Sequence, residues 1–182
     1  MILHEQSNVH PIDLDPSAVR NAALALTYYD RASHPETQDN LTWASPTAYH
    51  GSAKIVDTSG PIKEAIDLLI LLATGQGITV TNTVSYCQYY KQSDTEPAIH
   101  RDLCTGFEPD FEPTHGAVLW ISPHSNKFEF YLNEDGGDIL MEKDMVENTM
   151  IIFNHAFAHR VKPASFGTDQ SDSGLMLAVF MN

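Results

Sequence analysis

The sequence has few basic residues and few cysteines. Its 182 residues include ten Lys and Arg against twenty-four Asp and Glu, which gives a formal net charge of −14. Such a negative field repels a phosphate backbone, so nucleic acid is an unfavourable partner. The two cysteines, Cys87 and Cys104, lack the CxxC spacing of a zinc site and are typical of a protein from a reducing compartment.

Long apolar segments are also missing. No run approaches the roughly 18 apolar residues that cross a bilayer, so we expect no membrane partner. The first ten residues, MILHEQSNVH, lack the basic start and apolar core of a signal peptide. Together these absences predict a soluble, cytoplasmic protein, and the length is that of a single domain over residues 1–182.

Residues 1–77 are predicted to form a helical part with a long loop. An N-cap and a first-turn proline, Asp15-Pro16, open an amphipathic helix that extends to about Tyr29. Residues 30–53 are polar, contain two prolines and show no period, which is typical of a loop that forms a lid or contacts substrate. After Gly60-Pro61, the segment IKEAIDLLILLATG predicts a second helix.

Residues 78–182 change to a strand-like pattern. The segment ITVTNTVSYCQYY is rich in β-branched and aromatic residues. Seven further short segments follow, separated by Gly, Pro, Asn and Asp: IHRDL, HGAVLWIS, KFEFYL, DILME, TMIIF, HRVKPA and LMLAVF. Short strands between turn residues indicate a sandwich or a barrel, so the fold is predicted to be mainly β with N-terminal helices.

One short segment, IHRDL at residues 99–103, carries residue types that bind metals. Residues i and i+2 of a strand project from the same face, so His100 and Asp102 should point together and Arg101 away from them. An imidazole and a carboxylate on one face suit a divalent metal, and a third ligand would complete the facial triad of non-haem iron(II). The motif alone is equally compatible with a surface pair or a hydrogen-bonded His–Asp couple.

A second segment, IIFNHAFAHRVKP at residues 151–163, offers the third ligand. TMIIF predicts a buried strand, NHAFA a turn and HRVKPA a new strand. His159 opens the new strand, where its ring can face the barrel interior together with His100 and Asp102. His155, in the turn, is the rival candidate, and it could instead line the mouth of the cavity or cap the turn.

On these two motifs the sequence resembles the iron(II)- and 2-oxoglutarate-dependent dioxygenases, whose pattern is HxD followed by a distal histidine often written HRV or HxVxP. Here Asp102 and His159 are 57 residues apart, and Phe153 precedes His159 by the six residues usual in that family. The resemblance implies a double-stranded β-helix, or jelly roll, with two N-terminal helices packed on one sheet. It also implies an iron(II) site made by His100, Asp102 and His159.

The same resemblance implies an activity. Members of the family use molecular oxygen and convert 2-oxoglutarate to succinate, so this protein is expected to hydroxylate a small molecule, such as an amino acid, or a peptide. Related halogenases replace the acid of HxD with a small residue, and the carboxylate at Asp102 therefore favours hydroxylation or desaturation.

The sequence departs from the family where 2-oxoglutarate should bind. Most members hold its far carboxylate with an Arg or Lys on the last core strand, but SFGTDQSDSGLMLAVFMN contains neither. Lys127 is a candidate anchor by charge, although an exposed hairpin lysine would look the same. Tyr90 and Gln88, on one face of a strand, are candidates by hydrogen bonding, although they could be ordinary strand residues. Because charge-assisted hydrogen bonds are the stronger ones, Lys127 is expected to contribute more than Tyr90.

The missing basic residue keeps two other classes of function open. A cupin-like metalloenzyme would use the same barrel and metal without 2-oxoglutarate. A non-catalytic binding module would keep only a vestigial site. Succinate formation, metal-dependent turnover without succinate, and absence of metal binding separate these three hypotheses.

Overall fold

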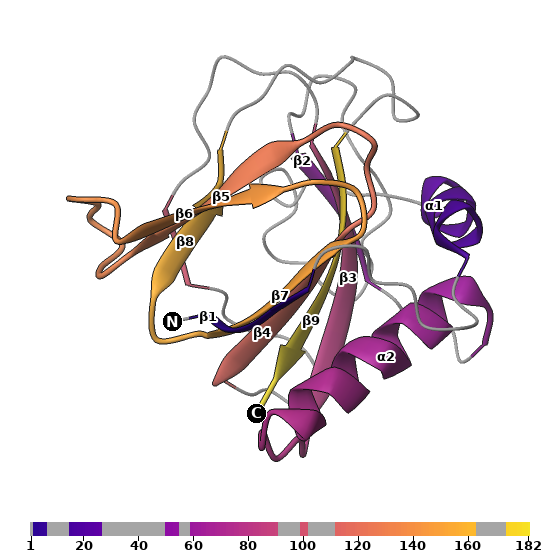
Figure 1. The fold of residues 1–182 in the computed structure, drawn as a ribbon, viewed down its shortest axis with the longest axis horizontal. Helices are drawn as coiled ribbons and strands as arrows, with labels where there is room; N and C mark the ends of the chain where they lie inside the picture. Colours follow the sequence, from indigo (N-terminus) through magenta and orange to yellow (C-terminus); the bar gives the residue numbers. More distant parts are fainter. Residues whose placement is uncertain are drawn as a thin grey trace.

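The computed structural model forms two helices and nine strands within its described residues. These residues are 2–6, 15–26, 50–54, 59–90, 99–101, 112–162 and 174–182. The strands make two antiparallel sheets, which pack face to face (Figure 1). The protein therefore has the jelly-roll fold that the sequence predicted.

Six strands form the large sheet, and every neighbouring pair in it is antiparallel. Their spatial order is β1 (Ile2–Gln6), β7 (Thr149–Asn154), β4 (His115–Trp120), β9 (Gly174–Met181), β3 (Thr83–Tyr90) and β2 (His50–Lys54). This order places strands that are distant in sequence side by side, as a jelly roll requires.

Three strands form the small sheet, in the order β6 (Met141–Met145), β5 (Asn126–Tyr131) and β8 (Ala158–Val161). On the far side of β8, His100 makes an isolated antiparallel bridge to His159. The segment that carries the HxD motif therefore adjoins the edge of the small sheet.

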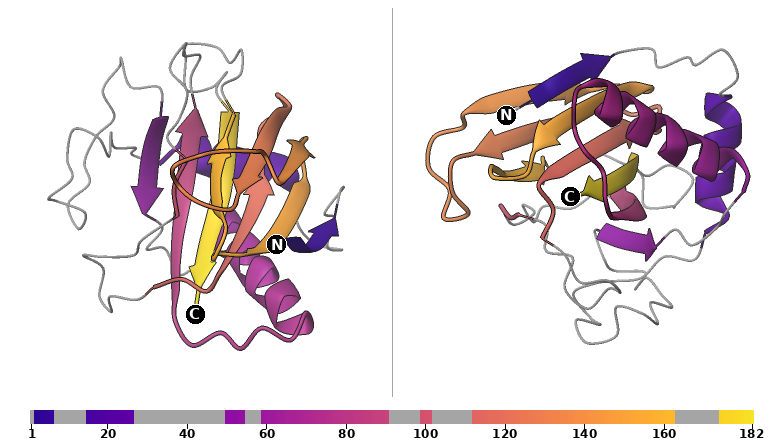
Figure 2. Two further views of the ribbon diagram at one scale, coloured as in Figure 1. Left: turned by 90° about the vertical axis from the view of Figure 1, so that its left-hand side faces the viewer. Right: turned by 90° about the horizontal axis from the view of Figure 1, so that it is seen from below.

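Both helices lie on the same side of the large sheet. Helix α1 (Pro16–Leu24) begins at Asp15, whose carboxylate accepts a hydrogen bond from the Ser17 amide at 2.9 Å. Helix α2 (Pro61–Gly75) buries its apolar face against the sheet, on the face away from the small sheet (Figures 1 and 2). Neither helix is long and apolar enough to cross a membrane.

Alternating side chains of the large sheet divide the core into two layers. On β4, Ala117 and Leu119 face the helices, whereas Val118 and Trp120 face the small sheet. A sheet that is covered on both faces needs apolar residues at nearly every position. This requirement explains why GLMLAVFM, the whole of β9, is buried.

The sequence-based boundaries were right for α2 and most core strands but wrong for the segments that precede α2. Helix α1 ends at Leu24, earlier than residue 29, and β2 occupies residues 50–54 at the end of the expected loop. As an edge strand, β2 is specified by its backbone pairing with β3 rather than by an apolar pattern. Strand β1 was not predicted at all. It pairs with β7 and completes the opposite edge.

Strand β6 begins three residues later than the segment DILME suggests. Residues 132–140 form the connection from β5, and Gly136 and Gly137 adopt φ values of 87° and 105°. These left-handed conformations favour glycine, as in many hairpin turns. The apolar residues Ile139 and Leu140 are exposed in this connection instead of facing the core.

Candidate metal centre and the adjoining pocket

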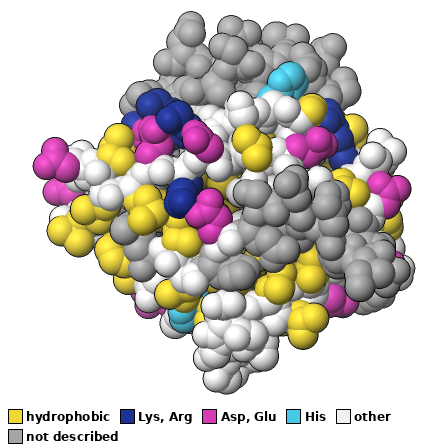
Figure 3. Space-filling view, in the orientation of Figure 1, with side chains coloured by type: hydrophobic (Ala, Val, Ile, Leu, Met, Phe, Trp, Pro, Cys, Tyr) yellow, Lys and Arg dark blue, Asp and Glu magenta, His cyan; other side chains and the backbone are white. Residues whose placement is uncertain are grey.

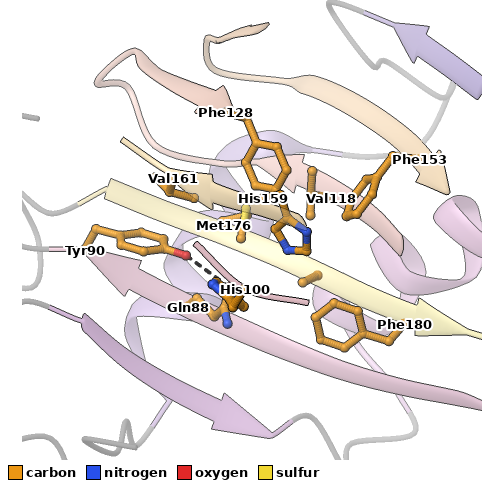
Figure 4. A pocket seen from close by; sticks show the side chains of 11 residues that line it. Gln88, Tyr90, His100, Val118, Phe128, Phe153, His159, Val161, Met176 and Phe180 are labelled. Carbon is orange, nitrogen blue, oxygen red and sulfur yellow. Dashed lines mark hydrogen bonds between the residues drawn. The ribbon is translucent and has the colours of Figure 1, made fainter. Parts of the chain in front are cut away.

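A small pocket, with a cavity volume of about 20 Å³, lies between the two sheets. Most of its wall is apolar and comes from β4, β5, β7, β8 and β9. Four polar side chains interrupt this wall: Gln88, Tyr90, His100 and His159 (Figure 4). The structure therefore brings both described histidines of the predicted triad to the same pocket as two of the three candidate cosubstrate residues.

The backbone positions His100 and His159 as a directly opposed pair. The His100 amide donates to the His159 carbonyl at 3.1 Å, and the His159 amide donates to the His100 carbonyl at 2.8 Å. Opposed residues of an antiparallel pair project to the same face. Accordingly, the two imidazole rings lie with their centroids 4.9 Å apart, close enough for both to serve one metal ion.

Phenylalanine rings surround His159, which is only 4% exposed. Phe128 stacks on it with centroids 5.2 Å apart and 20° between the planes, and Phe153 meets it edge-on at 5.1 Å. His159 Nδ1 lies 3.5 Å from the Phe157 carbonyl oxygen. A histidine ligand commonly turns its second nitrogen toward a carbonyl in this way, which leaves Nε2 for the metal.

Asp102, the third predicted ligand, lies outside the described residues. Among the side chains that the structure describes, no group of three or more His, Cys, Asp or Glu could hold a metal. The donor chemistry of His100 and His159 nevertheless fits a divalent metal that takes one further carboxylate. The complete triad stays a prediction.

His155, the rival candidate ligand, is buried beside His159 but lines a different pocket. Its ring is 3% exposed and lies edge-on to His159, with centroids 5.5 Å apart. It lines a wide, open pocket together with Arg101 and Glu112, and it does not line the pocket that His100 and His159 share. This placement favours His159 as the ligand. The pKa of the neighbouring His115 lies below its usual value. Burial is the main cause, and the charge of the nearby His155 is the second.

Tyr90 and Gln88 lie together, as their spacing on one strand predicts. Both side chains are buried, and the Tyr90 hydroxyl donates to Gln88 Oε1 at 3.2 Å (Figure 4). The Tyr90 ring stacks on Trp120, with centroids 6.4 Å apart. The pair thus adds a hydroxyl and an amide to a mostly apolar cavity wall.

Lys127 does not line the pocket. On β5, Phe128 and Phe130 face inward, so Lys127 faces outward, where its ammonium pairs with Glu142 and lies 3.7 Å from Asp144. Its side chain is 45% exposed, and the hydrogen bond to Glu142 raises the pKa of Lys127. The expectation that Lys127 anchors the cosubstrate disagrees with this geometry. The alternation of KFEFY contained the signal, because the two phenylalanines had to share the core face.

A buried ionic network on the outer face of the small sheet was missed by the sequence analysis. Glu129 is fully buried and accepts from Arg160 Nε at 2.7 Å and from the Tyr131 hydroxyl at 2.6 Å. Lys162 Nζ lies 3.4 Å from its other oxygen. Figure 3 shows basic and acidic side chains side by side over this part of the molecule. The network joins β5 to β8, the strand that carries His159.

The network shifts the ionisation of its members. Burial alone would raise the pKa of Glu129, but the hydrogen bonds from Tyr131 and Arg160 hold it below its usual value. Burial and the neighbouring carboxylate raise the pKa of Tyr131 to about 12. Val161 lines the pocket, whereas its neighbours Arg160 and Lys162 point away from it, toward Glu129.

No protein-family model matches the sequence, and no curated protein matches it either. Two solved structures resemble the fold over nearly the whole chain. A prolyl-4-hydroxylase from Pseudomonas putida has a TM-score of 0.56 and 18% identity, over 98% of this chain and 91% of that chain. HygX from Streptomyces hygroscopicus, solved with nickel and 2-oxoglutarate, has a TM-score of 0.58 and 12% identity, over 97% and 81%. The protein therefore shares the jelly-roll fold of these two proteins.

Proposed function

We propose that this protein is a non-haem iron(II) oxygenase that uses 2-oxoglutarate and molecular oxygen to hydroxylate a small molecule, such as an amino acid, or a peptide. One observation carries the proposal. His100 and His159 meet across a backbone bridge at a pocket that also contains the Tyr90–Gln88 pair. The fold, shared with a prolyl hydroxylase and with a protein that binds 2-oxoglutarate, supports it.

In this proposal His100, Asp102 and His159 hold the metal. Bound iron(II) would supply the chemistry of oxygen activation, with open positions beside three protein ligands. The surrounding protein prepares one ligand in advance. Phe128 and Phe153 fix the ring plane of His159 and exclude water from its buried faces. A ligand that is already oriented costs less conformational entropy on metal binding.

Tyr90 and Gln88 are the proposed polar contacts of the cosubstrate. Burying a carboxylate without partners costs several kcal/mol, so polar groups must receive it. Within the described part of the pocket wall, Tyr90 and Gln88 supply a hydroxyl and an amide, and no Lys or Arg is present. To bind a carboxylate, the Tyr90 hydroxyl would turn from Gln88 Oε1 toward the ligand. Tyr90 and Gln88 therefore replace Lys127 as the preferred candidates for binding the carboxylate of the cosubstrate.

The same lack of a cation in the described wall favours one alternative. A cupin-like metalloenzyme would use His100 and His159 without 2-oxoglutarate, and its pocket would need no group to balance a dianion. The two hypotheses share the metal and differ in the cosubstrate.

Succinate formation distinguishes them. The purified protein would be incubated with iron(II), ascorbate and 2-oxoglutarate, and succinate would be measured by mass spectrometry in the absence of substrate. We expect slow, iron-dependent succinate formation that disappears in His159→Ala. The control variant is His124→Ala, because His124 does not line the pocket. If the protein binds the metal but neither forms succinate nor binds 2-oxoglutarate, the result supports the cupin-like alternative. If it binds no metal, both the oxygenase and the cupin-like hypotheses are excluded.

A further inference from the structure

Arg101 stands between the two predicted ligands of the HxD motif, but its side chain is directed elsewhere. Its Nε donates to the Ala156 carbonyl at 2.9 Å, and its Nη2 donates to the Leu132 carbonyl at 3.0 Å. Ala156 lies in the turn between β7 and β8, and Leu132 follows the last residue of β5. One guanidinium thus joins the HxD segment to two separate segments.

The main chain of Arg101 is held as well. Its amide donates to Glu134 Oε1 at 2.8 Å. Glu134 belongs to the tight turn closed by the Asn133–Gly136 bridge, in the connection between β5 and β6. The residue is therefore fixed from both its backbone and its side chain, and every one of these contacts lies on elements that are not part of the HxD segment.

These contacts converge on the relative position of His100 and His159. The turn that contains Ala156 leads directly into Ala158 and His159, and the other two contacts hold the segment that contains His100. Apart from them, the backbone bridge supplies two hydrogen bonds between the halves of the site. We propose that Arg101 is a positioning residue that sets the separation of the two histidines. This inference rests on the proposed metal site.

The geometry requires arginine rather than any cation. Nε and Nη2 are donors of one rigid plane, and each reaches a different carbonyl. A lysine at this position keeps the charge, but a single ammonium on a flexible chain does not reproduce a fork with fixed directions. Lysine should therefore restore folding more fully than it restores the arrangement of the ligands.

The test compares cobalt(II) binding by the full-length protein, Arg101→Ala, Arg101→Lys and the surface control Lys143→Ala. Lys143 pairs with Glu5 at 2.5 Å and lines neither the pocket of His100 and His159 nor the one of His155. The visible absorption spectrum of bound cobalt(II) reports its coordination, and titration gives the affinity. Thermal unfolding of the metal-free proteins measures any general loss of stability.

We expect Arg101→Ala to lower cobalt(II) affinity by about 10–100-fold, the effect typical of residues that orient metal ligands, and to change the spectrum. Arg101→Lys should unfold near the wild-type temperature but keep an altered spectrum, and Lys143→Ala should behave like the wild type. Wild-type affinity and spectrum in Arg101→Ala would overturn the inference. If Arg101→Ala does not fold, a wild-type spectrum in Arg101→Lys would overturn it. Failure of the wild-type protein to bind cobalt(II) would instead reject the proposed metal site itself.

Discussion

His159 and His100 project side by side into the pocket, yet the protein holds them in different ways. His159 is 4% exposed, packed among aromatic rings, on a strand that the Glu129 network ties to β5. His100 is exposed, and its contacts within the described residues include the backbone bridge to His159, beside the contacts of its neighbour Arg101. The comparison indicates that the core sets the distal half of the site, whereas polar contacts hold the described part of the HxD segment. Substitutions in the two halves of the site should therefore have different effects.

The largest effect should come from His159 itself. His159→Ala is expected to abolish stoichiometric binding of manganese(II), because it removes a ligand that the core has already oriented. His155→Ala, which removes a buried imidazole only 5.5 Å away, should retain binding. Isothermal titration calorimetry measures both. Loss of binding in His155→Ala but not in His159→Ala would show that the turn histidine is the ligand.

The network behind β8 should contribute most to stability. Glu129→Gln leaves Arg160, whose side chain is 13% exposed, without its charged partner. We expect a loss of about 2–4 kcal/mol in the free energy of unfolding, from urea titration at pH 7. The matched control is Lys63→Ala, which removes an exposed helix pair with Asp67 and should change stability by less than about 0.5 kcal/mol. If Glu129→Gln and Lys63→Ala lower the free energy of unfolding by the same small amount, the network does not stabilise the attachment of β8.

The same network predicts a pH dependence with a definite sign. The pKa of Glu129 is lower in the folded protein than in the unfolded chain. Its contribution to stability is therefore complete above the unfolded pKa of about 4.3 and is lost as the pH falls through the lower, folded value. The stability difference between wild type and Glu129→Gln should shrink below about pH 4. A difference that grows on acidification would contradict the assigned ion pair.

Crowding at Gly116 offers a way to disturb His159 without touching it. A Cβ added to Gly116 would lie 2.5 Å from Cζ of Phe153, the ring that packs edge-on against His159. Gly116→Ala should cost about 1–3 kcal/mol of stability and weaken manganese(II) binding. Gly75→Ala is the control, because nothing lies within 4 Å of its added Cβ. Unchanged metal binding in a destabilised Gly116→Ala would show that Phe153 does not position the histidine.

The smallest effect concerns the cosubstrate. Tyr90→Phe removes a hydroxyl from the pocket and should weaken 2-oxoglutarate binding by about 10-fold, the value of one lost hydrogen bond of about 1.4 kcal/mol. Lys127→Ala should leave binding nearly unchanged, because the ammonium lies on the outer face with Glu142. Calorimetry with manganese(II) present compares the two. A larger loss of 2-oxoglutarate affinity in Lys127→Ala than in Tyr90→Phe would show that Lys127 is the more important anchor, as its charge suggested.

The sequence predicted the parts of the molecule that repeat a simple pattern. Short apolar runs between turn residues, as in LMLAVF, identified the core strands, and Gly60-Pro61 correctly marked the start of α2. It also identified His100 and His159, which meet in the structure, from the HxD motif and from the start of a strand. It failed at β1 and β2, which exist because a distant strand offers a partner for their backbones.

The sequence also did not predict which side chains that are distant along the chain contact each other. The contacts of Arg101 with two carbonyls and with Glu134 were not predicted. The burial of Glu129 could not be anticipated, since a glutamate on a strand usually faces water. The pairing of Glu129 with Arg160 depends on the register of β5 against β8, and no single segment encodes that register.

Anomalous diffraction from crystals soaked with manganese(II) and 2-oxoglutarate tests the central claim most directly. The account predicts one manganese peak within bonding distance, about 2.2 Å, of a nitrogen of His100 and a nitrogen of His159, with Asp102 as the third ligand and 2-oxoglutarate beside Tyr90. A manganese peak on His155, or a soaked crystal with the His100–His159 pocket empty, would contradict it.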